Sequence, residues 1–157
     1  MSIISYTFTV NGIERTTDEK KPLLRYLRGD LKLYSVKDGC SEGACGTCTI
    51  VVDGYAVKAC VLTTDRAAGK NIITVEGLSL REKEAFVYAF GTAGSVQCGF
   101  CIPGMVMAGK ALIDRNPDPT EDEIKKAIVE KRFYASQGPE IHIRREGDKF
   151  LVDCSPA

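Results

Sequence analysis

The chain has 157 residues, of which 44% are hydrophobic, and its 21 basic residues balance its 21 acidic residues. This length and composition fit one domain or two small ones with a packed core, and exclude a disordered chain. Without a basic excess, nothing indicates binding to nucleic acid or anionic lipid, and no apolar run is long enough to span a bilayer. Seven cysteines and no secretory signal suit metal or redox work in a reducing compartment, so we expect a cytoplasmic protein.

The N-terminal part is predicted to form two β-hairpins. Asn11-Gly12 and Asp53-Gly54 are dipeptides that favour tight turns between paired strands, and β-branched residues flank both. One short helix should begin after Pro22, with three leucines on one face, and end at Gly29. The expected strands cover 5–10, 13–17, 49–52, 55–57 and 71–75, and the expected helix covers 23–28. This is a small mixed sheet of the ferredoxin type, and we end its domain at residue 77.

The C-terminal part is predicted to be mainly helical. Helical patterns cover 82–90 and 104–115, the second preceded by Pro103 and followed by Asn116-Pro117. A capping box over 120–123 opens a third helix that should extend through Lys131. The residues expected to pack from these helices are Phe86, Tyr88, Phe90, Met105, Met107, Leu112, Ile124, Ala127 and Ile128.

Four cysteines between residues 40 and 60 carry the strongest functional signal. Cys40, Cys45 and Cys48 follow a C-x4-C-x2-C pattern, and Cys60 follows after eleven further residues. This is the plant-type spacing for four thiolates around one [2Fe–2S] cluster. Three thiolates from one loop require the backbone to curl around the cluster, which nearby glycines permit. We therefore predict that these four cysteines bind a [2Fe–2S] cluster.

Two other uses of four cysteines fit this stretch less well. A structural zinc site usually takes two C-x2-C knuckles, and only one pair here has that form. A disulfide framework is typical of secreted proteins, and nothing in the sequence indicates secretion.

A second pair, Cys98 and Cys101, forms a C-x2-C motif between the first two predicted helices. By itself this spacing is ambiguous, because it suits a dithiol, half a zinc knuckle or half of a second cluster site. A second cluster would need two more thiolates from elsewhere.

The chain resembles the iron–sulfur subunit of the molybdenum hydroxylases in two stretches, SVKDGCSEGACGTCTIVVDG with its following AC, and GSVQCGFCIPGM. That family includes xanthine dehydrogenase, aldehyde oxidoreductase, carbon monoxide dehydrogenase and nicotinate dehydrogenase. The resemblance implies an α+β fold. A β-grasp, plant-type ferredoxin-like domain over 1–77 would precede a four-helix domain over 78–157, with a divergent tail from about residue 132. It also implies one partner subunit with molybdopterin and another with FAD.

The same resemblance implies roles for individual residues. The cysteines at 40, 45, 48 and 60 would hold the cluster on the FAD side, and Cys98 and Cys101 would supply half of a cluster on the molybdenum side. Gln97 matches a residue near the pterin in relatives, and Ile102 stands where threonine is common. No catalytic residue is expected on this chain, because substrate would be oxidised on the molybdenum subunit.

The tail departs from the family pattern. Relatives carry a Cys-x-Cys-Thr-Gly-Tyr stretch after the third helix, whereas this chain has VEKRFYASQGPEIHIRREGDKFLVDCSPA. Cys154 is the one cysteine left there, and His142 is a candidate ligand, although a lone histidine is more often an ordinary strand or surface residue. Alternation over 140–144 and 149–152 predicts a hairpin in a divergent tail. A tail translated out of the ancestral frame is the alternative.

Three functions are compatible with these patterns. The first is the electron-transfer subunit of a molybdenum hydroxylase, relaying electrons from molybdopterin toward FAD. The second is a single-cluster ferredoxin-like carrier, and the third is a non-redox assembly scaffold. Iron content separates them, and two irons per chain are the expectation.

Overall fold

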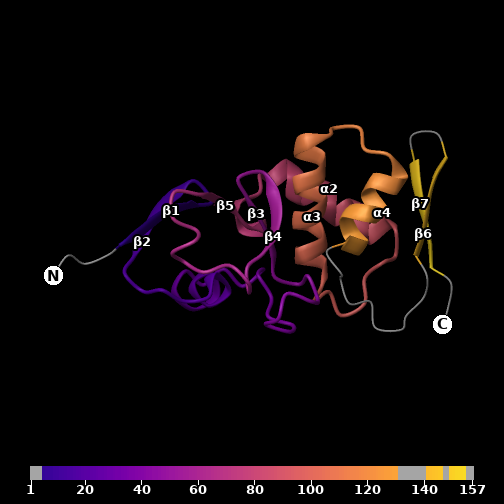
Figure 1. Ribbon diagram of the computed structural model, residues 1–157. Helices are drawn as coiled ribbons and strands as arrows, with labels where there is room; N and C mark the ends of the chain where they lie inside the picture. Colours follow the sequence, from indigo (N-terminus) through magenta and orange to yellow (C-terminus); the bar gives the residue numbers. More distant parts are fainter. Residues whose placement is uncertain (1–4, 131–140, 147–148, 155–157) are drawn as a thin grey trace.

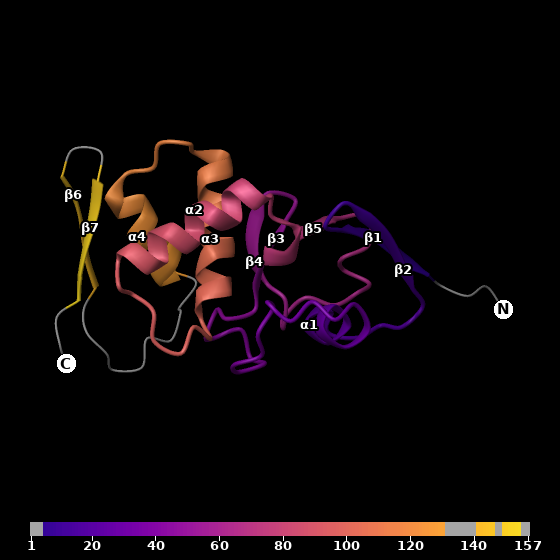
Figure 2. The ribbon, with the colours of Figure 1, turned by 180° about the vertical axis from the view of Figure 1, so that it is seen from behind.

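The computed structural model describes residues 5–130, 141–146 and 149–154, with side chains described as far as Ile128. A five-stranded mixed sheet lies at one end of the molecule and a two-stranded hairpin at the other (Figure 1). Three α-helices lie between them, and the same order is seen from behind in Figure 2. The described chain is therefore α+β, as the sequence predicts.

The sheet has the strand order β2-β1-β5-β3-β4. Strands β1 (Tyr6–Val10) and β2 (Ile13–Thr17) form one antiparallel hairpin, and β3 (Thr49–Val52) and β4 (Tyr55–Lys58) form the other. Strand β5 (Asn71–Ile73) joins them, because it pairs parallel to β1 and antiparallel to β3. Strand β5, the last of these five strands in sequence, thus lies at the centre of the sheet.

Both predicted hairpin turns are present. The backbone φ is positive at Asn11 (52°), Gly12 (80°), Asp53 (50°) and Gly54 (83°), as a two-residue turn with the right twist requires. Val10 pairs with Ile13 across the first turn, and Val52 pairs with Tyr55 across the second.

The last predicted strand is shorter than expected. It ends at Ile73, and Val75–Gly77 form a 3-10 turn (η2). The side chain of Asn11 explains the break, because its Oδ1 accepts from the Thr74 backbone N at 2.9 Å and its Nδ2 donates to Thr74 Oγ1 at 3.0 Å. These bonds occupy Thr74 where a longer strand would continue its ladder.

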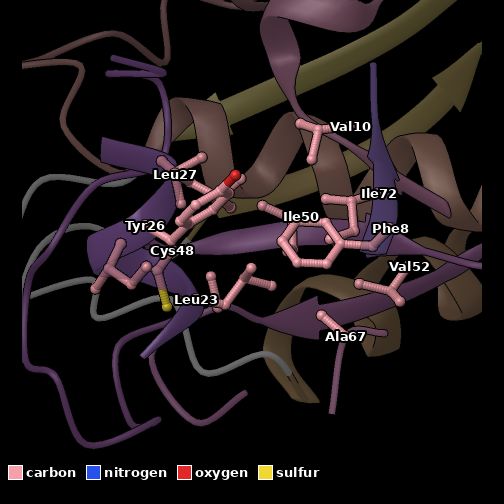
Figure 3. Packing of buried hydrophobic residues seen from close by; sticks show 13 residues of the cluster. Phe8, Val10, Leu23, Tyr26, Leu27, Cys48, Ile50, Val52, Ala67 and Ile72 are labelled. Atoms are coloured by element: carbon pink, nitrogen blue, oxygen red, sulfur yellow. The ribbon is translucent and has the colours of Figure 1, made fainter. Parts of the chain in front are cut away.

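One face of the sheet is covered by the predicted short helix. It comprises α1 (Leu23–Arg25) and a wider π-helical turn η1 (Tyr26–Asp30), so it ends one residue beyond the predicted glycine stop. Its leucines are buried, as expected, and the Tyr26 ring meets the Phe8 ring edge-on at 5.4 Å. Figure 3 shows these side chains against those of β1, β3 and β5, with Cys48 in the same cluster.

The opposite face is covered by α3 (Ile102–Arg115). Val106, Met107 and Ala111 of this helix pack with Val51 of β3 in a second apolar cluster. All four residues of β3 are buried, because layers on both faces leave neither side of this strand exposed to water. Strand β3 therefore places the residues that precede it against the core.

The remaining helices are α2 (Leu80–Thr92), which extends two residues beyond the predicted range at each end, and α4 (Glu121–Glu130). Capping boxes start both: Ser79 with Glu82, and Thr120 with Glu123. Helix α2 buries no residue fully.

The expected packing residues of these helices differ in burial. Met107 is buried, and the predicted core role of Tyr88 is wrong, because this side chain is 74% exposed on the outer face of α2. The residues that are half-buried are Phe86, Phe90, Met105, Leu112, Ile124, Ala127 and Ile128.

The tail forms the predicted hairpin. Strand β6 (Ile141–Glu146) pairs antiparallel with β7 (Lys149–Cys154), and His142 stands opposite Asp153. Three α-helices follow η2 within the described residues, one fewer than the resemblance implies. The predicted extension of the third helix to Lys131 lies outside the described residues. None of the described helices is both long and apolar enough to cross a membrane.

Candidate metal centre

The first three cysteines lie on the loop between η1 and β3, and the fourth follows β4. Cys48 directly precedes Thr49, the first residue of β3, and Cys60 comes two residues after the end of β4. The backbone N of Ala59 donates to the Cys48 carbonyl at 3.1 Å, so the paired hairpin brings these two cysteines side by side. A sequence separation of twelve residues is thereby closed by the ladder of β3 and β4.

Backbone N–H groups of the loop point at the cysteine sulfurs. Cys40 Sγ accepts from the backbone N of Glu42 and of Cys45, both at 3.4 Å. Cys60 Sγ accepts from the backbone N of Gly43 at 3.2 Å, which ties the fourth cysteine to the loop of the other three. Such donors stabilise negative charge on sulfur, as a metal-bound thiolate requires.

The two ends of the site differ in burial and in acidity. Cys45 and Cys48 are buried, and Cys40 and Cys60 are half-buried. The N–H groups of Cys45 and Glu42 lower the pKa of the Cys40 thiol to about 7. Burial raises the pKa of the Cys48 thiol to about 12. A hydrogen bond from the Cys60 backbone N–H lowers this pKa in part, and the neighbouring Cys60 and Cys45 thiols raise it. All four sulfurs thus influence at least one other member of the group.

Glycines make room for this arrangement. A Cβ added at Gly43, where φ is +76°, would stand 2.7 Å from Val61 Cγ1. A Cβ added at Gly39 would stand 2.8 Å from Thr47 Oγ1 and 2.9 Å from Cys45 Sγ. All three distances are shorter than a normal contact of a Cβ atom, so these positions require glycine for space, and Gly43 also for its backbone conformation.

Two residues near the sulfurs were not anticipated from the sequence. Thr47 Oγ1 lies 3.1 Å from Cys45 Sγ and 3.4 Å from the Lys37 carbonyl. The Lys58 Nζ donates to the carbonyl of Gly43 and holds the tip of the loop against β4. A threonine within a C-x2-C pair is visible in the sequence, but its orientation toward Cys45 depends on the curl of the loop.

Two acidic residues of the cluster loop, Asp38 and Glu42, are exposed. Asp38 accepts from Ser41 Oγ at 2.7 Å, and Glu42 contributes its backbone N to Cys40 rather than its carboxylate. Both carboxylates lie on the solvent side of the loop. They fit the ordinary role of solvated loop acids.

The four thiols fit a [2Fe–2S] cluster better than a single ion. Within the described residues, no three His, Cys, Asp or Glu side chains converge on one metal position. A tetrahedral zinc site needs such convergence, whereas a [2Fe–2S] cluster spreads four thiolates over two irons. Our predicted ligands therefore remain Cys40, Cys45, Cys48 and Cys60. Backbone N–H groups donate to two of these sulfurs, as expected for metal-bound thiolates.

The second cysteine pair is arranged differently. Cys98 is exposed and Cys101 is half-buried, directly before α3. Burial raises the pKa of the Cys101 thiol, and the charge of Cys98 adds to this rise. Gln97 is exposed beside them. The Lys37 Nζ lies 6.0 Å from the centroid of the Phe100 ring, so this motif adjoins the loop of the first four cysteines.

The second pair does not have the donors of a four-thiolate cluster. Of the seven cysteines, four belong to the first site and Cys154 is the one that remains besides Cys98 and Cys101. Cys154 and His142 lie in the β6–β7 hairpin at successive ladder positions, opposite Ile141 and Asp153 respectively. Three thiols are one short of the usual set.

Comparison with known protein families identifies two successive iron–sulfur regions. A model of the "2Fe-2S iron-sulfur cluster binding domain" matches residues 9–87, and a model of the "[2Fe-2S] binding domain" matches residues 74–132. The first region contains the four-cysteine site, and the second contains the C-x2-C pair.

Curated relatives are similar over most of their length. The nicotinate dehydrogenase small FeS subunit of Eubacterium barkeri is 44% identical over 82% of this chain and 83% of its own. The nicotine 6-hydroxylase small subunit of Paenarthrobacter nicotinovorans is 40% identical over 76% of this chain and 73% of its own.

Solved structures share the fold. Quinoline 2-oxidoreductase from Pseudomonas putida matches with a TM-score of 0.72 and 35% identity, over 80% of both chains. Aldehyde oxidoreductase from Desulfovibrio desulfuricans matches with a TM-score of 0.76 and 33% identity, over 83% of this chain but 15% of that longer one. With the cysteine spacing, the mixed sheet and both family models in agreement, the chain belongs to the iron–sulfur small subunits of the molybdenum hydroxylases.

Proposed function

We propose that this chain is the electron-transfer subunit of a molybdenum hydroxylase complex and holds one [2Fe–2S] cluster on Cys40, Cys45, Cys48 and Cys60. It would relay electrons from a molybdopterin-bearing large subunit toward a FAD-bearing subunit. The observation that supports this most strongly is the convergence of backbone N–H groups on Cys40 Sγ and Cys60 Sγ. When bound, such a cluster accepts and releases one electron at a time.

The residues of this chain set how such a cluster is held. Buried Cys45 and Cys48 anchor it to the core, and the N–H donors stabilise the negative charge that reduction adds. Half-buried Cys40 and Cys60 mark the side nearer to solvent. We place the FAD-bearing partner on that side, because electron transfer requires a short separation between the two groups.

The second cysteine motif is assigned to the opposite partner. Gln97 and Cys98 are exposed and accessible to another chain, and we propose that they face the molybdopterin-bearing subunit. We propose no electron transfer through a second cluster on this chain, because only three cysteines remain outside the first site. We divide the chain into a ferredoxin-like domain over 1–77 and a helical domain over 78–157, and we assign it to the cytoplasm, where thiols stay reduced.

A second candidate function is supported by the incomplete donor set. A single-cluster carrier would need the four cysteines of the first site and no permanent partner. A non-redox assembly scaffold would need no cluster at all. The similarity to small subunits favours a permanent complex over both.

Iron and acid-labile sulfide counting on the purified chain, with electron paramagnetic resonance of the reduced protein, tests this proposal. Two irons and one signal per chain are expected, with co-purification of a molybdopterin-containing chain when the complex is isolated from its source. Cys45→Ser should bleach the visible spectrum, and Cys154→Ser should leave it unchanged. A spectrum unaffected by Cys45→Ser would overturn the ligand assignment, and two irons without any partner would favour the carrier.

A further inference from the structure

The C-x2-C motif of Cys98 and Cys101 lacks the partners that a cluster requires. The chain has seven cysteines, and a cluster on the first loop uses four of them. Cys154 is the one other cysteine of the chain, so this chain can offer at most three thiols to a second cluster. Cys98 and Cys101 are therefore available for chemistry other than cluster binding.

The backbone brings the two cysteines together. The chain bends at 97–98 and again at 100–101, with Gly99 between the bends at a φ of +75°. The backbone N of Ile102 donates to the Gly99 carbonyl at 3.3 Å, which closes the turn directly before α3. Cys98 and Cys101 stand on either side of Gly99 and Phe100, and a separation of three residues around such a bend is one that a disulfide can span.

The two thiols differ in access to solvent. Cys98 is exposed, whereas Cys101 is half-buried at the start of α3. The intervening Phe100 is 44% exposed, with the Lys37 ammonium 6.0 Å from its ring centroid. In the chain before it binds the molybdopterin-bearing subunit, a small-molecule disulfide therefore reaches Cys98 first, and Cys101 is placed to attack second.

We propose that Cys98 and Cys101 form a reversible dithiol–disulfide pair that exchanges with small-molecule disulfides. The proposal rests on the single-cluster composition proposed above. The Cys98 thiolate attacks one sulfur of the small disulfide, forms a mixed disulfide and releases one thiolate. The Cys101 thiolate then attacks the Cys98 sulfur and releases the second. The pair loses two electrons and two protons, and the small disulfide gains both as two thiols.

Peptide mapping of the full-length, iron-loaded protein tests this directly. The protein is equilibrated in mixtures of oxidised and reduced dithiothreitol, quenched in acid, treated with a maleimide under denaturing conditions and digested with trypsin. The tryptic peptide 84–110 contains Cys98 and Cys101 and no other cysteine, whereas the remaining cysteines fall in 38–58, 59–66 and 150–157. A disulfide within 84–110 therefore has a different mass from any cross-link between two of these peptides.

The expected result is a peptide 84–110 that carries two maleimide groups in reduced mixtures. In oxidised mixtures it should carry none and be about 2 Da lighter than the free dithiol, because two hydrogens have left. The conversion should follow the dithiothreitol ratio and reverse. Cys98→Ser and Cys101→Ser should each abolish it, and Cys154→Ser should not.

Three outcomes would overturn the proposal. The first is a peptide 84–110 that carries two maleimide groups at every ratio. The second is a cross-link between 84–110 and 150–157, which would make Cys154 the partner. The third is four irons per chain, falling to two in Cys98→Ser, which would show a second cluster. The first two leave the proposed single-cluster function intact, because iron counting tests that function separately.

Discussion

The hydroxyl of Thr47 lies 3.1 Å from the sulfur of Cys45, and both side chains are buried. A cysteine bound to iron has no proton to donate, so in the loaded protein the hydroxyl would donate to this sulfur, in competition with the Lys37 carbonyl at 3.4 Å. Hydrogen bonds to cluster sulfurs favour the reduced state, which carries the extra negative charge.

Thr47→Val should therefore lower the reduction potential of the cluster. A net contribution of about 1 kcal/mol for one hydrogen bond corresponds to a decrease on the order of tens of mV for a one-electron couple. Potentiometric titration followed by electron paramagnetic resonance measures the change. Thr47→Ser keeps the hydroxyl and should shift the potential by much less. Equal potentials in Thr47→Val and the parent protein would show that the bond does not act on the cluster.

Gly43→Ala should prevent stable cluster binding. The added Cβ would be 2.7 Å from Val61 Cγ1, at a backbone φ of +76°. Strain of ~1–2 kcal/mol from the left-handed backbone adds to a steric cost of similar size. Iron content and melting temperature of the purified chain measure the effect.

Gly54→Ala is the matched control for this substitution. Its φ of +83° imposes the same type of backbone strain, but nothing lies within 4 Å of the added Cβ. It should destabilise by ~1–2 kcal/mol while iron binding persists. If Gly43→Ala loses no more iron than Gly54→Ala, the contact with Val61 does not limit the loop.

Glu82→Gln should make the stability less dependent on pH in acid. The Glu82 carboxylate accepts a hydrogen bond from Ser79 Oγ and pairs with Lys110. These interactions lower the pKa of the Glu82 carboxyl from 4.5 to about 2, and the bond from Ser79 contributes most. A lowered pKa means that the carboxylate stabilises the fold above pH 4.5 and that this contribution is lost between pH 4.5 and about 2. Because the side chain is partly solvent-screened, we expect a loss of only ~1 kcal/mol at pH 7.

Urea unfolding followed by circular dichroism at several pH values checks this expectation. The difference between Glu82→Gln and the parent protein should shrink as the pH falls toward 2. Glu121→Gln, which removes one pair with Lys125 on α4, should cost less than about 0.5 kcal/mol. A difference for Glu82→Gln that is constant with pH would contradict the assignment.

Glu76→Ala should loosen the segment that leads into the cluster loop. Its carboxylate accepts from the Ser35 backbone N at 2.9 Å, from the Ser35 hydroxyl, and from Thr74 Oγ1 at 2.6 Å. Burial alone would raise the pKa of Glu76, but these donors outweigh it and the pKa is lowered. Removing the carboxylate takes the acceptor from the buried Thr74 hydroxyl and from the two half-buried Ser35 donors, at a cost of ~1–3 kcal/mol in the free energy of unfolding.

A double-mutant cycle with Ser35→Ala isolates the pairwise part of this clamp. The two substitutions together should cost less than the sum of each alone, with a coupling energy of ~0.5–2 kcal/mol. Glu84→Ala on the exposed side of α2 should change the stability by less than about 0.5 kcal/mol. Additive costs would show that Glu76 acts through other contacts.

The sequence alone predicted the parts of this protein that depend on local chemistry. Tight turns at Asn11-Gly12 and Asp53-Gly54, the capping box of Thr120 and the buried leucines of α1 all follow from short-range patterns, and the structure confirms them. The family resemblance followed from cysteine spacing, because a cluster restricts where four thiolates lie along a loop. Where the chain departs from the family, the missing cysteines were equally plain.

Only the tertiary structure decided which face of each element is covered and what surrounds the sulfurs. Strand β5 stops early because Thr74 is held by Asn11 from 63 residues away, and Tyr88 is exposed because no described part of the chain covers that face of α2. Thr47 reaches Cys45 because the loop curls, and Phe100 meets Lys37 because α3 packs on the sheet beside that loop. Such contacts join residues far apart in sequence or depend on the path of a whole loop, and no short-range pattern encodes them.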